Sequence, residues 1–199
     1  MTDHVLKVCI LGHSFTSRAD RYLRDMGIEN LNLPRISHNI SLNGRGGAHF
    51  SDLIEMFNQT GVLQPDILVL DFGTNDLFNS NLVPTLSLAR QYFNLAKHML
   101  DHYGVKHIII LEVLPRTSWG RYGAPHSFSA RVISFNNAIK SLVLHLDHTA
   151  PITFWFNKGF PSKIESFISD GCHLNAEGMA KYIKSIRRAV IKVSRSLRL

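Results

Sequence analysis

The sequence predicts a doubly wound, three-layer α/β/α domain on a five-stranded parallel sheet of the flavodoxin type. Short apolar segments of strand length alternate along the chain with longer segments whose apolar residues recur at helical spacing. The 199 residues suffice for one sizeable core, and a hydrophobic fraction of 45% is ordinary for a globular chain. No linker or repeat interrupts the pattern, so we expect one domain over residues 1–199.

The expected strands are short, apolar and rich in β-branched residues, and they cover 5–11, 35–42, 67–72, 105–114 and 151–156. The expected helices each carry an apolar stripe, and they cover 16–26, 48–58, 84–103, 129–146 and 176–195. Pro84 at the start of the long third helix and Gly104 just beyond it fit the usual boundary signals. Residues 115–128 and 157–172 are expected to be loops, the second with a short helical turn.

Composition restricts the class of protein. No apolar run approaches the ~20 residues of a membrane span, and the first residues lack the pattern of a signal peptide. Two cysteines, Cys9 and Cys172, make no disulfide framework and are expected to be free thiols. We therefore expect an intracellular, cytoplasmic protein. No motif implies a metal or an organic cofactor.

The segment 169–175, just before the last helix, places a carboxylate and an imidazole three residues apart. Asp170 can accept a hydrogen bond from one ring nitrogen of His173, which fixes the tautomer and leaves the other nitrogen free to take a proton. A base oriented in this way requires a nucleophile.

Polar motifs follow four of the five predicted strands. They are Gly12-His13-Ser14, Gly44 to Gly47, Gly73-Thr74-Asn75-Asp76, and the loop that leads to Asp170 and His173. In a parallel sheet the ligand site lies beyond the carboxyl ends of the strands, so these motifs should meet at one edge. This convergence favours a functional site over four unrelated turns.

Each motif has a chemical role in such a site. Ser14, at a strand end and a helix start, can act as a nucleophile activated by an adjacent base. The tetrahedral oxyanion that would form needs preorganised donors. The backbone N–H of Ser14, the backbone N–H of Gly47 and the side-chain amide of Asn75 could supply them.

These four blocks, in this order, resemble those of the SGNH (GDSL-like) hydrolases over residues 5 to about 195. The resemblance implies a serine esterase that cleaves carboxylic esters, with Ser14 as nucleophile, His173 as base and Asp170 as its orienting carboxylate. Ser14, Gly47 and Asn75 would form the oxyanion hole. Gly47 fits the family spacing best, and Gly44 and Gly46 remain alternatives.

One residue departs from the family pattern: His13 stands where the family usually has Asp. A ring would then replace the hydrogen bonds of a carboxylate beside the nucleophile, which bears on the level of activity. The last block, followed by a basic helix, also resembles SGNH domains of retrotransposon-type proteins. That resemblance implies an esterase acting near lipid or nucleoprotein.

Other enzyme classes are less consistent with the sequence. The mid-chain Gly-x-Ser-x-Gly of the α/β-hydrolases is absent. His145, Asp147 and His148 lie close together, but no second cluster matches them as a metal site. Cys172 is a third alternative, as a nucleophile, although it shares a loop with the base.

A binding module is the alternative from another class. The net charge of +7 resides in residues 179–199, which hold seven basic side chains and no acid. The basic face of residues 181–198 could contact nucleic acid or an anionic membrane, in addition to a small-molecule or lipid ester in the site. No aromatic residue follows Tyr182, so the sequence does not predict base stacking there. The oligomeric state is not readable from the sequence.

Overall fold

The computed structural model describes residues 4–62, 64–79, 83–116, 125–147, 150–160 and 164–198. Its five strands are β1 (Leu6–Gly12), β2 (His38–Gly44), β3 (Ile67–Asp71), β4 (His107–Leu111) and β5 (Ile152–Trp155). All four strand pairings are parallel, and the order is β2-β1-β3-β4-β5. The predicted fold class is confirmed.

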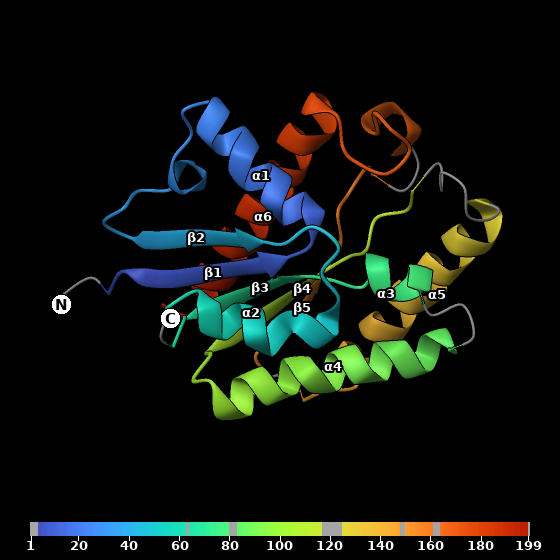
Figure 1. Cartoon of the computed structure of the whole chain (residues 1–199). Helices are drawn as coiled ribbons and strands as arrows, with labels where there is room; N and C mark the ends of the chain where they lie inside the picture. The colour runs from blue at the N-terminus through green and yellow to red at the C-terminus, as the bar shows by residue number, and fades with distance from the viewer. Residues whose placement is uncertain are drawn as a thin grey trace.

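Helices cover both faces of the sheet (Figure 1). On one face lie α1 (Ser14–Asp25) and α6 (Ala176–Ser196), and on the other lie α2 (Leu53–Gln59), α4 (Thr85–His102) and α5 (Pro125–Leu144). A short helix α3 (Thr74–Asn79) follows β3, and 3₁₀ turns cover Asn30–Asn32, Phe50–Asp52 and Ile164–Phe167. None of the helices in these described ranges combines the length and the apolar character needed to cross a bilayer.

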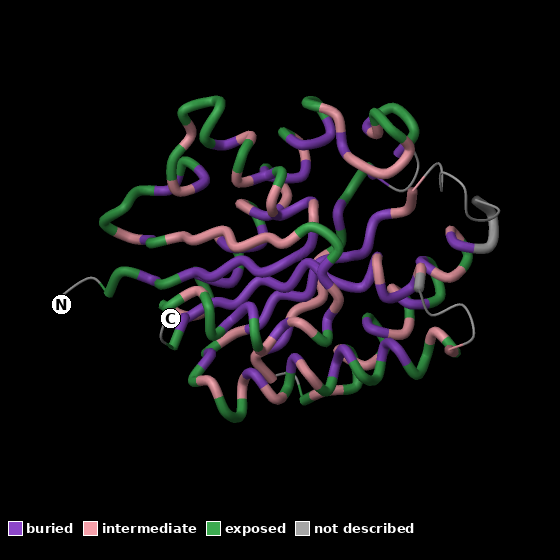
Figure 2. Tube along the Cα trace, in the orientation of Figure 1, coloured by how far each residue is buried: buried purple, intermediate pink, exposed green. Residues whose placement is uncertain are grey.

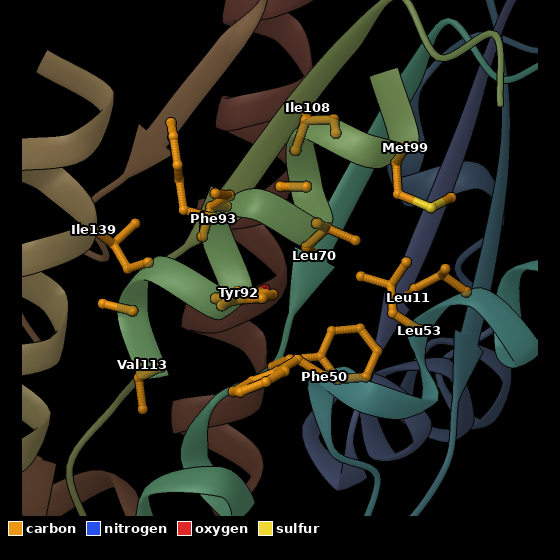
Figure 3. Close-up of a cluster of buried hydrophobic side chains, with 14 of the residues drawn as sticks. Leu11, Phe50, Leu53, Leu70, Tyr92, Phe93, Met99, Ile108, Val113 and Ile139 are labelled. Carbon is orange, nitrogen blue, oxygen red and sulfur yellow. The ribbon is translucent and has the colours of Figure 1, made fainter. Parts of the chain in front are cut away.

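The central strands β1, β3 and β4 are almost entirely buried between the two helical layers, whereas most residues of the edge strands β2 and β5 are only partly buried (Figure 2). One core fills the space between the sheet and α2, α4 and α5, where Phe50, Leu70 and Tyr92 come together (Figure 3). Tyr92 stacks on Phe50 with ring centroids 5.5 Å apart. A second core joins the other face of the sheet to α1 and α6.

Several predicted boundaries are wrong for local reasons. The second strand begins three residues late because the backbone N–H groups of Ser37 and His38 both bond to the carbonyl of Pro34 in a turn. Helix α5 begins at Pro125, inside the segment expected to be a loop, since proline is favoured in the first helical turn. Helix α3 was not predicted, because six residues are too few to show a period.

A polar network at the carboxyl end of β4 ties that strand to β5 and α6. Buried Glu112 accepts a hydrogen bond from the backbone N–H of Asn157 over 2.8 Å. The Asn157 side chain in turn accepts a bond from Ser185 of α6 over 2.7 Å. Burial raises the pKa of Glu112 from 4.5 to about 7, with the Asn157 bond opposing the change.

The raised pKa of Glu112 predicts a pH-dependent stability. Between about pH 4.5 and 7 the folded protein keeps a proton that the unfolded chain has released, so the free energy of unfolding falls as the pH rises. Glu112→Gln should remove up to about 3 kcal/mol of this decline, measured by urea unfolding across the interval. The exposed control Glu165→Gln should show the same dependence of the free energy of unfolding on pH as the wild type. If this dependence is the same for the wild type and both variants, Glu112 is not its cause.

Candidate functional site

The loop before α6 holds Asp170 and His173 as a hydrogen-bonded pair. His173 Nδ1 donates to Asp170 Oδ2 over 2.7 Å. The other carboxylate oxygen accepts the backbone N–H groups of Cys172 and His173, at 2.9 and 2.6 Å. Partial burial opposes ionisation, but these three bonds and the adjacent ring lower the pKa of Asp170 below its ordinary value. The carboxylate therefore fixes the proton of His173 on Nδ1 and leaves Nε2 able to accept one.

Backbone bonds close this loop at its base. Ile168 pairs with Leu174 in an antiparallel bridge, and the N–H of Ser169 donates to the carbonyl of His173 over 2.9 Å. Asn175 then caps α6 by accepting the N–H of Gly178 over 2.8 Å. The imidazole is thus presented from a short closed loop between the last 3₁₀ turn and the start of α6.

Ser14 is the first residue of α1, directly beyond β1, and His13 is the N-cap of that helix. Buried His13 accepts the N–H of Phe15 at Nδ1 over 3.3 Å, and its Nε2 lies 3.4 Å from Asp71 Oδ1. An imidazole that accepts at Nδ1 carries a proton on Nε2, and this N–H faces Asp71. Ser14 Oγ lies 3.5 Å from the same Nδ1. His13 therefore performs the capping that a short polar side chain usually performs at this position.

Asp71, the last residue of β3, anchors this helix start. Its Oδ2 accepts the Thr16 hydroxyl over 2.9 Å, and the carboxyl group is almost fully buried. Burial would raise the pKa of Asp71, but His13 and Thr16 outweigh it and hold the pKa below its ordinary value. A buried ionised carboxylate thus fixes the first turn of α1, which carries Ser14, to the centre of the sheet.

The glycine segment after β2 separates into structural and cavity-lining residues. A side chain at Gly44 would collide with the backbone nitrogen of Ser17, so Gly44 allows β2 to pack against α1. Gly46 and Gly47 line a cavity next to Ser14, and Gly47 has a φ of 76°, which favours glycine. Of the three alternatives, Gly46 and Gly47 line this cavity and Gly44 does not.

Asn75 is held by two hydrogen bonds. Its Nδ2 donates to the carbonyl of Ala48 over 2.9 Å, and its Oδ1 accepts from Arg116 over 3.1 Å. Since the amide nitrogen carries two hydrogens, one is left for a ligand in the cavity. The neighbouring Asp76 is buried and accepts the N–H of Phe50 over 3.2 Å, which joins the 3₁₀ turn after the glycine segment to α3.

One cavity of about 460 Å³ brings these motifs together, within the usual size range for small-molecule sites. The residues that line it are Ser14, Ser17, Arg18, Arg21, Gly46, Gly47, Asn75, Arg116, Cys172 and His173. The ring of His173 also packs edge-to-face on Phe15, with centroids 6.4 Å apart, so the base loop lies over the start of α1. In the described part of the chain the backbone N–H groups of Ser14 and Gly47 have no acceptor.

The structure also bears on the alternative nucleophile Cys172 and on the alternative metal site. Cys172 Sγ lies 3.9 Å from His173 Nε2, but burial raises the pKa of this thiol, which favours the less reactive protonated form. Among the described residues no group of three His, Cys, Asp or Glu side chains could hold a metal ion, and His148 lies outside those residues. Trp119 and Tyr122, in the segment 115–128 that is expected to be a loop, also lie outside the described residues.

A second groove, on the outer side of α6, combines basic and aromatic side chains. Phe154, Trp155 and Phe156 lie beside Lys184, Arg188 and Lys192 in a groove of about 510 Å³. Aromatic residues therefore do accompany the basic face in space, although none follows Tyr182 in the sequence. Phe154 and Trp155 belong to β5 and Phe156 follows it, in a segment that lies beside α6 in space although it is distant in sequence.

Three residues of the site were missed by the sequence analysis. Asp71 was counted as part of an apolar strand, Asp76 was quoted only as part of a motif, and Arg116 was one residue of a polar loop. The polar end of an otherwise apolar strand is the signal that could have identified Asp71. Nothing near Arg116 in the sequence indicates its contact with Asn75.

Comparisons with solved structures agree with this architecture. A carbohydrate esterase family 3 protein from Talaromyces cellulolyticus superposes with a TM-score of 0.65 at 19% identity, covering 96% of this chain and 99% of that one. A catalytic mutant of an acetylxylan esterase from Geobacillus stearothermophilus gives 0.66 at 12% identity, covering 94% and 95%. A GDSL-like lipase from Bacteroides thetaiotaomicron gives 0.64 at 16% identity, covering 96% and 92%. At these identities the likeness establishes the fold.

A search of curated proteins finds no match to the sequence. The model of one family matches residues 10–181, which include all four blocks of the site. The chain belongs to the GDSL-like lipase/acylhydrolase family, whose members are hydrolases that act on ester bonds.

Proposed function

We propose that the protein is a serine esterase in which Ser14 attacks the ester carbonyl and His173 takes the proton of the hydroxyl. The observation that carries this proposal is the single cavity lined by Ser14 from the start of the chain and His173 from its end. Asp170 holds His173 in the tautomer that the reaction needs. The acetyl esters named for two of the similar structures make short acyl groups the first substrates to test.

The reaction proceeds in two halves. Ser14 Oγ adds to the carbonyl carbon while His173 Nε2 accepts its proton, and the resulting oxyanion is bound by the N–H groups of Ser14 and Gly47 and the amide of Asn75. His173 then returns the proton to the departing alcohol, which leaves an acyl-serine. Water, deprotonated by the same ring, releases the acid and restores the enzyme.

Fluorophosphonate labelling tests the nucleophile. The wild type should gain one adduct by intact mass, and Ser14→Ala should gain none and lose turnover of para-nitrophenyl acetate by about 10⁴-fold or more. Ser17→Ala is the matched control, since Ser17 lines the same cavity three residues further along α1. Labelling of the Ser14→Ala variant, or an unlabelled wild type, would refute the assignment.

Asp170→Asn tests the orientation of the base. An amide cannot accept the Nδ1 proton of His173 through its nitrogen, so the wrong tautomer becomes available and kcat for para-nitrophenyl acetate should fall by about 10³–10⁴-fold. Glu177→Gln, an exposed change in the first turn of α6, should leave kcat unchanged. Wild-type turnover in Asp170→Asn would exclude Asp170 from the mechanism.

A second candidate function is binding of single-stranded nucleic acid in the groove beside α6. Phe156 is 50% exposed there, and Lys192 lies 6.0 Å from the ring centre of Trp155. Exposed aromatic rings beside cations suit stacked bases and phosphates. A bilayer is disfavoured because the apolar side of α6, which includes Ile183, Ile186 and Val190, is buried in the core. This function would also suit a protein with weak or no esterase activity, and the retrotransposon-type resemblance agrees with it.

Fluorescence anisotropy with a labelled single-stranded RNA tests this groove. Affinity should fall steeply with salt, and both the affinity and its salt dependence should be largely lost when Lys184, Arg188 and Lys192 are changed to Glu. Phe156→Ala should weaken binding by about tenfold or more. The triple variant Arg90→Glu, Lys97→Glu, Lys140→Glu, with exposed residues of α4 and α5, is the charge-matched control on the opposite face. Binding to phosphatidylserine vesicles without binding to RNA would overturn the proposal.

A further inference from the structure

The cavity that holds Ser14 is bordered by arginines. Arg18 and Arg21 come from α1, and Arg116 comes from the segment after β4. None of the described residues that line the cavity is an Asp or Glu. Asp170, next to the cavity-lining Cys172 and His173, is already bonded to His173 and to backbone N–H groups. The entrance to the site is therefore strongly positive.

Arg18 and Arg21 lie on the same side of α1 as Ser14, four and seven residues further along the helix. Both side chains are exposed, and neither forms an ion pair within the described ranges of the chain. Other exposed arginines of the N-terminal part of the chain form ion pairs. Arg24 pairs with Asp20 at 2.7 Å and Arg35 with Glu29 at 2.9 Å, and Arg45 pairs with two carboxylates. The unpaired charge on α1 is thus concentrated at the cavity.

Arg116 adds positive charge deeper in the cavity. It is half-buried and donates to Asn75 Oδ1, so its guanidinium lies beside the proposed donors for the oxyanion. Arg18 and Arg116 both act electrostatically on Cys172, which places them on the same side of the site as the base loop. A ligand in the cavity would be exposed to guanidinium groups at its outer and inner ends.

We propose that the ester substrate carries an anionic group, a carboxylate or a phosphate, which Arg18 and Arg21 bind while the ester carbonyl lies at Ser14. A planar guanidinium matches such groups with two parallel hydrogen bonds. A neutral ester would leave both arginines without a partner in the complex. This inference rests on the proposed esterase function, and it adds the chemical class of the substrate.

Two matched pairs of esters test the preference. In the first pair the anion is on the acyl side, with para-nitrophenyl hexanoate and the mono-para-nitrophenyl ester of adipate. In the second it is on the alcohol side, with methyl para-acetoxybenzoate and para-acetoxybenzoate. For at least one pair the wild-type kcat/KM should be higher for the anionic ester, and added salt should reduce that advantage.

The double variant Arg18→Glu, Arg21→Glu should lower the ratio of anionic to neutral kcat/KM by about tenfold or more. Arg18→Ala, Arg21→Ala should lower it less, and Arg90→Glu on α4 should leave it unchanged. Circular dichroism melting checks that each variant folds. Two results would overturn the inference while leaving the esterase function intact. One is an equal loss of kcat/KM for the anionic and the neutral ester of each pair in the double variant. The other is a wild type whose kcat/KM is no higher for the anionic ester of either pair.

Binding to the Ser14→Ala variant separates the two proposals. Calorimetry with the unreactive amides para-acetamidobenzoate and methyl para-acetamidobenzoate should show tighter binding of the anion, lost when Arg18 and Arg21 are reversed. If the wild type lacks turnover but this difference is found, the anion site stands and the esterase function fails. If neither amide pair nor ester pair shows a difference, the anion site fails.

Discussion

The buried carboxylate of Asp71 is the constraint on which the site depends. It closes β3 at the centre of the sheet and remains ionised because His13 and Thr16, the residues on either side of Ser14-Phe15, both donate to it. Leaving such a charge without its partners typically costs about 3–5 kcal/mol, so the first turn of α1 has little freedom to move away from the strand. The position of Ser14 is therefore set by the core of the protein and only indirectly by its surface loops.

The remaining parts of the site are also held by polar side chains, which form hydrogen bonds with backbone groups of a neighbouring motif. Asp76 accepts the N–H of Phe50, and Asn75 donates to the carbonyl of Ala48, so the segment after β3 fixes the glycine segment after β2. Arg116 then fixes Asn75 from the segment after β4. Residues brought to one sheet edge by topology thus hold one another in place through hydrogen bonds, of which the bond from Arg116 is charge-assisted.

The order of strands and helices, and the edge of the sheet at which the motifs meet, could be predicted because both follow from periodicity and from the handedness of parallel crossovers. The cavity brings together Ser14, Gly47, Asn75 and His173 as expected, while their chemical roles stay predictions. Contacts between distant segments could not be predicted. The approach of Trp155 to Lys192, the bond from Arg116 to Asn75 and the pairing of His13 with Asp71 all depend on three-dimensional proximity that local patterns do not contain.

The neighbouring positions of Asp170 and His173 have one more consequence. Because both belong to a single closed turn, their mutual geometry is a local property and would persist through small displacements of the surrounding layers. Ser14, in contrast, is delivered from the opposite end of the polypeptide. A displacement of one helical layer relative to the sheet would therefore affect the reaction by changing the distance between the Ser14 hydroxyl and the His173 ring. Substitutions far from the site should change how often the Ser14 hydroxyl and the His173 ring come within hydrogen-bonding distance. They should leave the tautomer of the imidazole unchanged.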